Sequence, residues 1–214
     1  MPFDQGGQDH NASPFNSLPP VAVALALAIV AVELVLELAA NGYLGGPAGI
    51  GWRQQAFQDF SVWKPWMAAM FEAGRYTPDL FWRFVTYPFL QYGFTQMVFS
   101  VVILLALGKF VGEVFSGLAL LLCWLGSAAI GAGVFLALTD TQVALAGGMT
   151  ANYGLVGAFT WLLWRKARMT GGSPAAAFRL IGVLIAIQLL FLLIAGGAGP
   201  IIVAELGGFA GGFL

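Results

Sequence analysis

The chain has 214 residues, of which 59% are hydrophobic and 9% are charged, with a formal net charge of −1. A soluble domain carries about 25% charged residues, so this composition excludes an ordinary soluble protein and indicates residence in a lipid bilayer. The near-neutral charge leaves no basic surface for nucleic acid. Cys123 and His10 are the single cysteine and histidine, so we expect no metal site and no cofactor.

The predicted elements are a tail followed by membrane helices. Residues 1–20 are polar and turn-rich, and we expect them to form a disordered tail before a transmembrane domain over residues 21–214. A helix needs about 20 apolar residues to cross a bilayer. Enough apolar stretches follow to predict an all-α membrane protein with six transmembrane helices. We expect these helices at about 21–40, 85–107, 118–138, 150–164, 178–195 and 199–214.

A long loop, residues 41–82, separates the first two predicted helices. It contains Trp52, Trp63, Trp66 and Trp82. Tryptophan is enriched at the headgroup level of membranes, so the stretch "FSVWKPWMAAMF" indicates an interfacial segment lying in the membrane surface. The alternative is an ordinary extramembrane loop.

Basic residues predict the orientation of the chain. The connection between the fourth and fifth helices, "WRKARMTGGSPAAAFR", carries four of them: Arg165, Lys166, Arg168 and Arg179. The positive-inside rule places such a cluster in the cytoplasm. With an even number of helices, both termini are then cytoplasmic, in a plasma or inner membrane.

Small residues recur at helical spacing. Ser127 and Gly131 form one pair four residues apart, and Gly154 and Ala158 form another. Such pairs let membrane helices approach closely, which predicts a compact bundle. We find no internal repeat, which disfavours the transporter folds that are built from repeats.

Three carboxylates lie in predicted membrane helices. Glu33 and Glu37 share one face of the first helix, and Glu205 lies in the last. Hydrogen bonds to neighbouring helices are one interpretation, and a proton or ion path is the other. We favour the first, because no basic partners recur on the other helices.

The second predicted helix carries Gln91, Gln96 and Ser100. Taken alone, amides and hydroxyls in a membrane are mostly hydrogen-bonding links between helices. Together with other stretches they form a recognisable pattern. The stretches are "FWRFVTYPFLQYGFTQMVFSVVILLALGKFVGE", "GGMTANYGLVGA" and "AELGGFAGGFL".

From about residue 80 to 214 the chain resembles the rhomboid family of intramembrane serine proteases. Trp82, Arg83 and Thr86 match the family's approach to the second helix, and Gly108 to Glu113 matches a turn after it. The long aromatic loop also fits. The resemblance implies a six-transmembrane-helix rhomboid-like bundle, with an interfacial loop between helices 1 and 2.

The resemblance also implies that the protease site is altered. Met149 stands at the position of the nucleophilic serine, and Glu205 at the position of the histidine base. Three further residues stand at the positions that help to bind the oxyanion: Gln91, Gln96 and Ser100. Tyr153 matches an aromatic residue of the family. "LAGG" is then a loop dipping into the membrane, with the fourth helix beginning near Thr150.

A thioether is no acyl-transfer nucleophile, so Met149 cannot replace the serine. Thr150 with Glu205 is the fallback pair, but Thr150 points about 100° away around the helix. We therefore expect no catalysis and a protein whose partners are the bilayer and the transmembrane helices of client proteins. An endopeptidase with an altered site is the first alternative, and a small transporter or channel using the carboxylates is the second. We also expect Glu205 to be a neutral acid bonded to Gln96 or Ser100.

Overall fold

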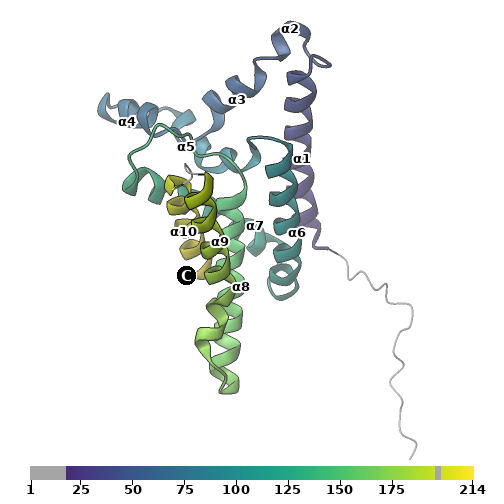
Figure 1. Cartoon of the computed structure of the whole chain (residues 1–214), viewed down its shortest axis with the longest axis vertical. Helices are drawn as coiled ribbons and strands as arrows, with labels where there is room; N and C mark the ends of the chain where they lie inside the picture. Colours follow the sequence, from purple (N-terminus) through teal and green to yellow (C-terminus); the bar gives the residue numbers. More distant parts are fainter. Residues whose placement is uncertain (1–17, 196–198) are drawn as a thin grey trace, which may run out of the picture.

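The computed structural model describes residues 18–195 and 199–214, and helices dominate it (Figure 1). The predicted tail therefore falls almost wholly outside the described residues. Within them there is no strand, only an isolated bridge between Val62 and Leu145. The helices are α1 (Pro20–Ala40), α2 (Gly46–Gly49), α3 (Trp52–Phe60), α4 (Lys64–Glu72), α5 (Pro78–Thr86), η1 (Tyr87–Phe89), α6 (Phe94–Val114), α7 (Gly117–Leu138), α8 (Met149–Thr170), η2 (Pro174–Phe178), α9 (Arg179–Ala195) and α10 (Gly199–Phe213).

The apolar helices make the chain a multi-pass membrane protein. Four stretches of the described residues are long and apolar enough to cross a bilayer: α1, α6, α7 and the run Pro174–Ile194 that joins η2 to α9. α10 is a shorter apolar helix of 15 residues. α8 has 22 residues, and its last turns carry three of the four residues of the predicted basic cluster, while Arg179 begins α9.

The predicted bounds of the second helix, 85–107, are wrong. The chain instead forms α5, the short 3₁₀ turn η1 and then α6, which begins at Phe94 and ends at Val114. Pro88 lies in η1 and has no amide hydrogen to donate, so a continuous helix through it would lose a hydrogen bond and clash with the preceding turn. The other five helices begin within one residue of the predicted positions.

The expected turn from Gly108 to Glu113 is also wrong, because both residues lie inside α6. Gly108 serves close packing instead: a Cβ added to it would lie 2.9 Å from the Cβ of Ala22 on α1. α8 likewise runs past its predicted end at 164. It stops where Gly171 takes the left-handed conformation (φ 72°) that glycine adopts without strain.

The long loop between α1 and α5 is attached to the segment before α8. Val62 and Leu145 exchange backbone hydrogen bonds of 3.0 and 2.8 Å between nitrogen and oxygen. The Trp63 indole donates to the carbonyl of Gln142 at 3.1 Å. Figure 1 shows α2, α3 and α4 gathered at one end of the bundle. The position of this loop in the membrane interface stays a prediction.

The Trp82–Arg83–Thr86 motif fixes α5 to the end of α3. Arg83 donates from Nη1 to the carbonyl of Ser61 at 2.8 Å, and its guanidinium lies 4.1 Å from the ring centroid of Trp66. Thr86 donates to the carbonyl of Phe60 at 3.2 Å. The motif therefore has a structural role that its residue types alone do not reveal.

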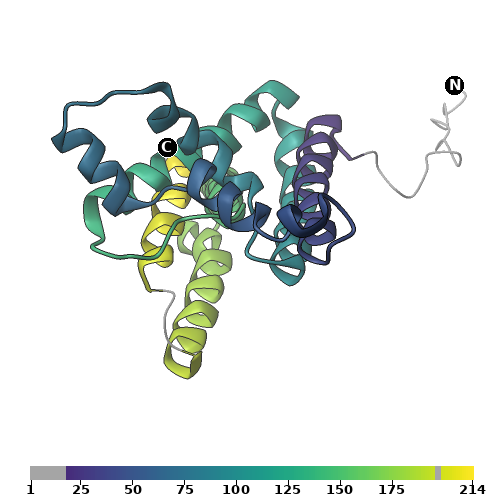
Figure 2. The same ribbon diagram turned by 90° about the horizontal axis from the view of Figure 1, so that it is seen from above.

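Helices α7, α8 and α10 form the tightly packed centre of the bundle. A Cβ added to Gly154 of α8 would lie 2.1 Å from Oγ of Ser127, and one added to Gly208 of α10 would lie 2.2 Å from the carbonyl oxygen of Thr150. The prediction that small residues let these helices approach closely is thus confirmed. Figure 2 shows α9 standing at the edge of this bundle.

Candidate functional site

The loop that precedes α8 brings backbone to the centre of the site. The amide of Gly147 donates to the carbonyl of Tyr87 at 3.1 Å. Gly147 has φ +104°, a conformation that side-chain-bearing residues rarely adopt. A Cβ on Gly148 would lie 2.5 Å from Oγ of Ser100 and 3.2 Å from the carbonyl oxygen of Pro88. Both glycines are therefore required where the loop passes α6 and η1.

The structure brings the predicted oxyanion-side residues to this loop. A Cβ on Gly147 would lie 2.7 Å from Nε2 of Gln96 and 3.6 Å from Oε1 of Gln91. Ser100 lies against Gly148, as described above. Residues 91, 96, 100, 147 and 148 thus form one cluster at the start of α8.

Hydrogen bonds orient the two amides. Gln91 is fully buried and donates from Nε2 to the carbonyl of Pro88 at 3.0 Å, while its Oε1 is buried without a hydrogen-bond partner. Gln96 accepts from the amide of Tyr92 at 2.7 Å through Oε1, which turns its Nε2 toward Gly147. The cluster therefore offers one unused acceptor beside the loop and a side-chain donor facing it.

Asn152 completes the cluster, and sequence reasoning missed it. The residue is fully buried on α8. It accepts from the indole of Trp124 at 2.9 Å and donates to the carbonyl and hydroxyl oxygens of Ser100 at 2.9 and 3.2 Å. The signal available in the sequence was an amide three residues after Met149, in the first turns of a helix whose charged residues all lie at its other end. Asn152 joins α6, α7 and α8.

Asn152→Leu is expected to lower the free energy of unfolding by about 2 kcal/mol, because hydrogen bonds between membrane helices contribute about 0.6–2 kcal/mol each. Trp124→Phe removes a single bond and is expected to cost about 1 kcal/mol. Unfolding of both variants and of the double variant in mixed micelles gives the coupling energy. Strict additivity of the two effects would show that the Trp124–Asn152 bond contributes nothing.

The two residues that open α8 differ in their surroundings. Met149 is half-buried and packs against the hydrophobic core. Thr150 is 1% exposed, and a Cβ on Gly131 would lie 2.2 Å from its methyl carbon. Tyr87 is fully buried nearby, and its phenol donates to the carbonyl of Ala128 at 2.9 Å. Burial raises the pKa of Tyr87 above its usual range, and the Thr150 side chain opposes this rise more weakly.

Comparison with known families decides what scaffold this site belongs to. A model of the rhomboid domain matches residues 78–214. The chain belongs to the rhomboid family. The matched region runs from α5 to α10 and contains every predicted site residue, while α1 and most of the long loop precede it. No curated protein matches the chain.

Glu205 of this rhomboid lies on α10 and is 5% exposed. The expected partners, Gln96 and Ser100, are wrong: Glu205 accepts a hydrogen bond from Nε2 of Gln188 on α9. Gln96 and Ser100 are engaged elsewhere, with the backbone of Tyr92 and with Asn152. The carboxylate therefore links α10 to the peripheral helix α9.

Glu33 and Glu37 have a cationic partner, which comes from the loop and not from a membrane helix. Arg53 of α3 contacts both Glu33 oxygens at 3.0 Å and one Glu37 oxygen at 2.9 Å. It also donates to the carbonyl of Gln91 at 3.0 Å. The side chain of Glu33 is fully buried. Both carboxylates thus act as anchors for α3, which favours the structural interpretation over an ion path.

Proposed function

We propose that this rhomboid-family membrane protein is catalytically inactive and binds transmembrane helices of client proteins. The observation that carries the proposal is Met149 at the start of α8, where the family resemblance aligns the nucleophilic serine. A thioether cannot form an acyl-enzyme. Glu205, aligned with the histidine base, is bonded to Gln188.

Thr150 makes a poor substitute nucleophile. Attack on a carbonyl needs a hydroxyl free to approach both a base and the substrate. The side chain of Thr150 is only 1% exposed, and its methyl group lies in the α7–α10 contact. These contacts support the absence of the altered-site protease activity that was the first alternative.

Client binding has two supports in the described residues. Gln96 is half-buried, and its Nε2, which faces Gly147, can donate to the backbone of a client segment that unwinds there. α9 offers apolar side chains that are about half-exposed, among them Val183, Ile187 and Leu190. A client helix would thus meet the apolar face of α9, and an unwound client segment would meet the polar cluster at the Gly147 loop.

The proposed topology has six transmembrane helices, with α8 and α10 crossing in addition to the four long apolar stretches. Arg165, Lys166 and Arg168 at the end of α8 place the α8–α9 connection in the cytoplasm. Both termini then lie in the cytoplasm of a plasma or inner membrane. α10 at 15 residues is about 22 Å long, so it would cross only where buried among its neighbours.

A cleavage assay in liposomes tests the catalytic half of the proposal. Wild type and the Thr150→Val/Glu205→Ala variant would each meet a panel of single-span membrane substrates. We expect no cleavage by either. Cleavage by wild type that disappears in the variant would overturn the proposal and establish an unorthodox protease.

Photocrosslinking of single-span helix probes tests the binding half. Gln96→Leu is expected to reduce crosslinking to the Gly147 loop about fivefold, the equivalent of one membrane hydrogen bond. Thr95→Val is the matched control, because Thr95 precedes Gln96 but is exposed. Equal crosslinking in both variants, or none in wild type, would contradict client binding at this cluster.

A further inference from the structure

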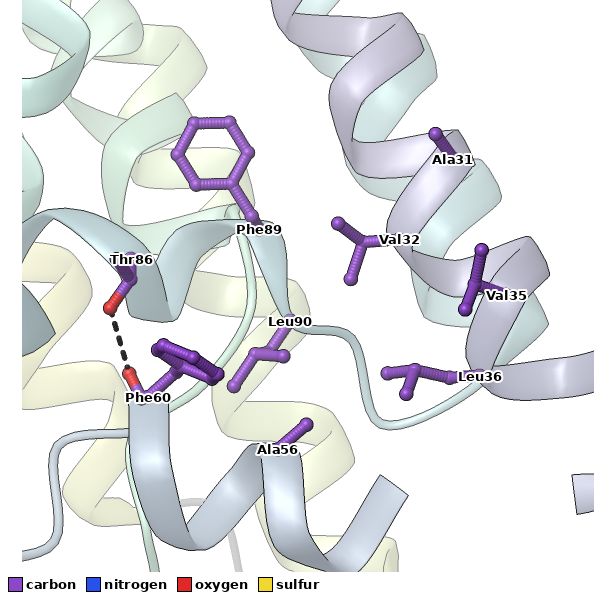
Figure 3. Close-up of a pocket in the computed structure, with 9 residues that line it drawn as sticks. All are labelled: Ala31, Val32, Val35, Leu36, Ala56, Phe60, Thr86, Phe89 and Leu90. Atoms are coloured by element: carbon purple, nitrogen blue, oxygen red, sulfur yellow. Dashed lines mark hydrogen bonds between the residues drawn. The ribbon is translucent and has the colours of Figure 1, made fainter. Parts of the chain in front are cut away.

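An apolar hollow lies between α1, α3 and the α5–η1 corner. Its volume is about 460 Å³, within the roughly 300–1,000 Å³ of ligand pockets. Figure 3 shows side chains from three parts of the chain converging on it. The lining residues are Ala31, Val32, Val35, Leu36, Ala56, Phe60, Thr86, Phe89 and Leu90.

The hollow has no free polar group of its own. Thr86 is its only polar lining residue, and its hydroxyl donates to the carbonyl of Phe60, drawn as the dashed line in Figure 3. Val32 and Leu36 extend into the hollow from α1, a helix apolar and long enough to cross a bilayer. An occupant of this part must therefore be hydrocarbon.

The hollow continues into a polar rim along α3. A neighbouring hollow shares Leu36, Ala56 and Phe60 with it and adds Trp52, Gln55 and Asp59. A third is formed by residues 51, 54, 55, 58 and 59, which are a glycine, three glutamines and the same aspartate. We call the three hollows together the groove. Along α3, its lining changes from wholly apolar side chains to the amides of three glutamines and the carboxylate of Asp59.

The rim is acidic, and the nearby cations are occupied. None of the described side chains that line the three hollows is basic. Arg53 follows Trp52 in the chain, but its guanidinium is held by Glu33 and Glu37. Arg83 is 5% exposed and engaged with Ser61. Asp59 is therefore the charge that a headgroup in the rim would meet.

We propose that this groove binds one molecule of phosphatidylethanolamine. One acyl chain fills the apolar hollow, the primary ammonium donates to the carboxylate of Asp59, and the amides of Gln55 and Gln58 donate to the phosphate. The order of apolar and polar segments matches a lipid, whereas a transmembrane helix presents hydrocarbon along its whole side. An anionic lipid such as phosphatidylglycerol would meet the negative charge of Asp59, because Arg83, the cation that interacts with Asp59, is buried and bonded to Ser61. Phosphatidylcholine has no N–H to donate.

Native mass spectrometry of the full chain, titrated with each of these three lipids, tests the proposal. We expect phosphatidylethanolamine to bind about tenfold more tightly than phosphatidylglycerol. Ala56→Trp fills the hollow and is expected to weaken binding about tenfold. Ala69→Trp is the matched control, since Ala69 is exposed on α4 and outside the hollow. Asp59→Asn is expected to abolish the headgroup preference, while Glu72→Gln on α4 keeps it.

Mapping photocrosslinks on the wild-type chain makes the test independent of how the variants fold. Phosphatidylethanolamine with a photoreactive acyl chain should label Val32, Val35 or Ala56. Labels confined to the outer faces of α7 or α9, or equal affinity for all three headgroups, would show an ordinary lipid annulus and overturn the proposal. So would a second copy or a client helix crosslinked through Ala56 in place of lipid.

Discussion

Replacing Gly212 with alanine is expected to lower the free energy of unfolding by about 3 kcal/mol, the upper end of the usual cost of overpacking a core. A Cβ at this position would lie 1.9 Å from the carbonyl oxygen of Gly154 and 2.5 Å from its carbonyl carbon. Both atoms belong to the backbone of α8, so rotation of a side chain cannot relieve the clash. The helices would have to separate, and the contact between α8 and α10 holds the start of α8 in the site.

Gly133→Ala is the matched control for Gly212→Ala. Gly133 lies in α7, and a Cβ added there meets no atom within 4 Å. The added methyl is expected to be neutral or to stabilise by up to about 1 kcal/mol through helix propensity. Unfolding of both variants in mixed micelles would measure the difference. Equal stabilities would mean that α8 and α10 do not touch at Gly154.

Sequence reasoning predicted the helices and the close packing because both are local properties. Apolar length sets a membrane helix, and four-residue spacing of small side chains sets which face approaches a neighbour. Gly131 and Gly154 therefore emerged correctly as contact residues. Pro88 was the local signal that was overlooked, and it lies in η1, the short turn between α5 and α6.

The polar pairs were out of reach for a different reason. Gln188 and Glu205 lie on different helices, and Arg53 is 20 residues from Glu33. Their pairing depends on the rotation of each helix and on the path of a loop, and neither leaves a periodic trace in the sequence. The family resemblance assigned Gln91, Gln96 and Ser100 to one site, and they lie together beside the Gly147 loop. Asn152 matched no motif, so sequence reasoning missed it.

Arg53→Ala is expected to destabilise the protein by about 3–5 kcal/mol, the usual cost of leaving a buried charge without its partner. The Glu33 side chain is fully buried, and Arg53 supplies hydrogen bonds to both of its oxygens. Glu37 keeps 45% of its side chain exposed, so water can replace Arg53 there. The loss should therefore come from Glu33, and Glu37→Gln alone should cost less than about 1 kcal/mol.

The double variant Arg53→Ala/Glu33→Gln separates the charge from the packing. Removing the buried negative charge should recover more than half of the stability lost in Arg53→Ala, measured by unfolding in mixed micelles. A double variant as unstable as the single one would show that Arg53 acts through packing or through its bond to Gln91.

The bond from Arg53 to Gln91 also connects the loop to the site. Arg53 donates to the carbonyl of Gln91, and the Gln91 side-chain amide faces the Gly147 loop. Crosslinking of helix probes should therefore stay reduced in the double variant even where stability recovers, because Glu33→Gln removes a charge without restoring the lost contact with Gln91.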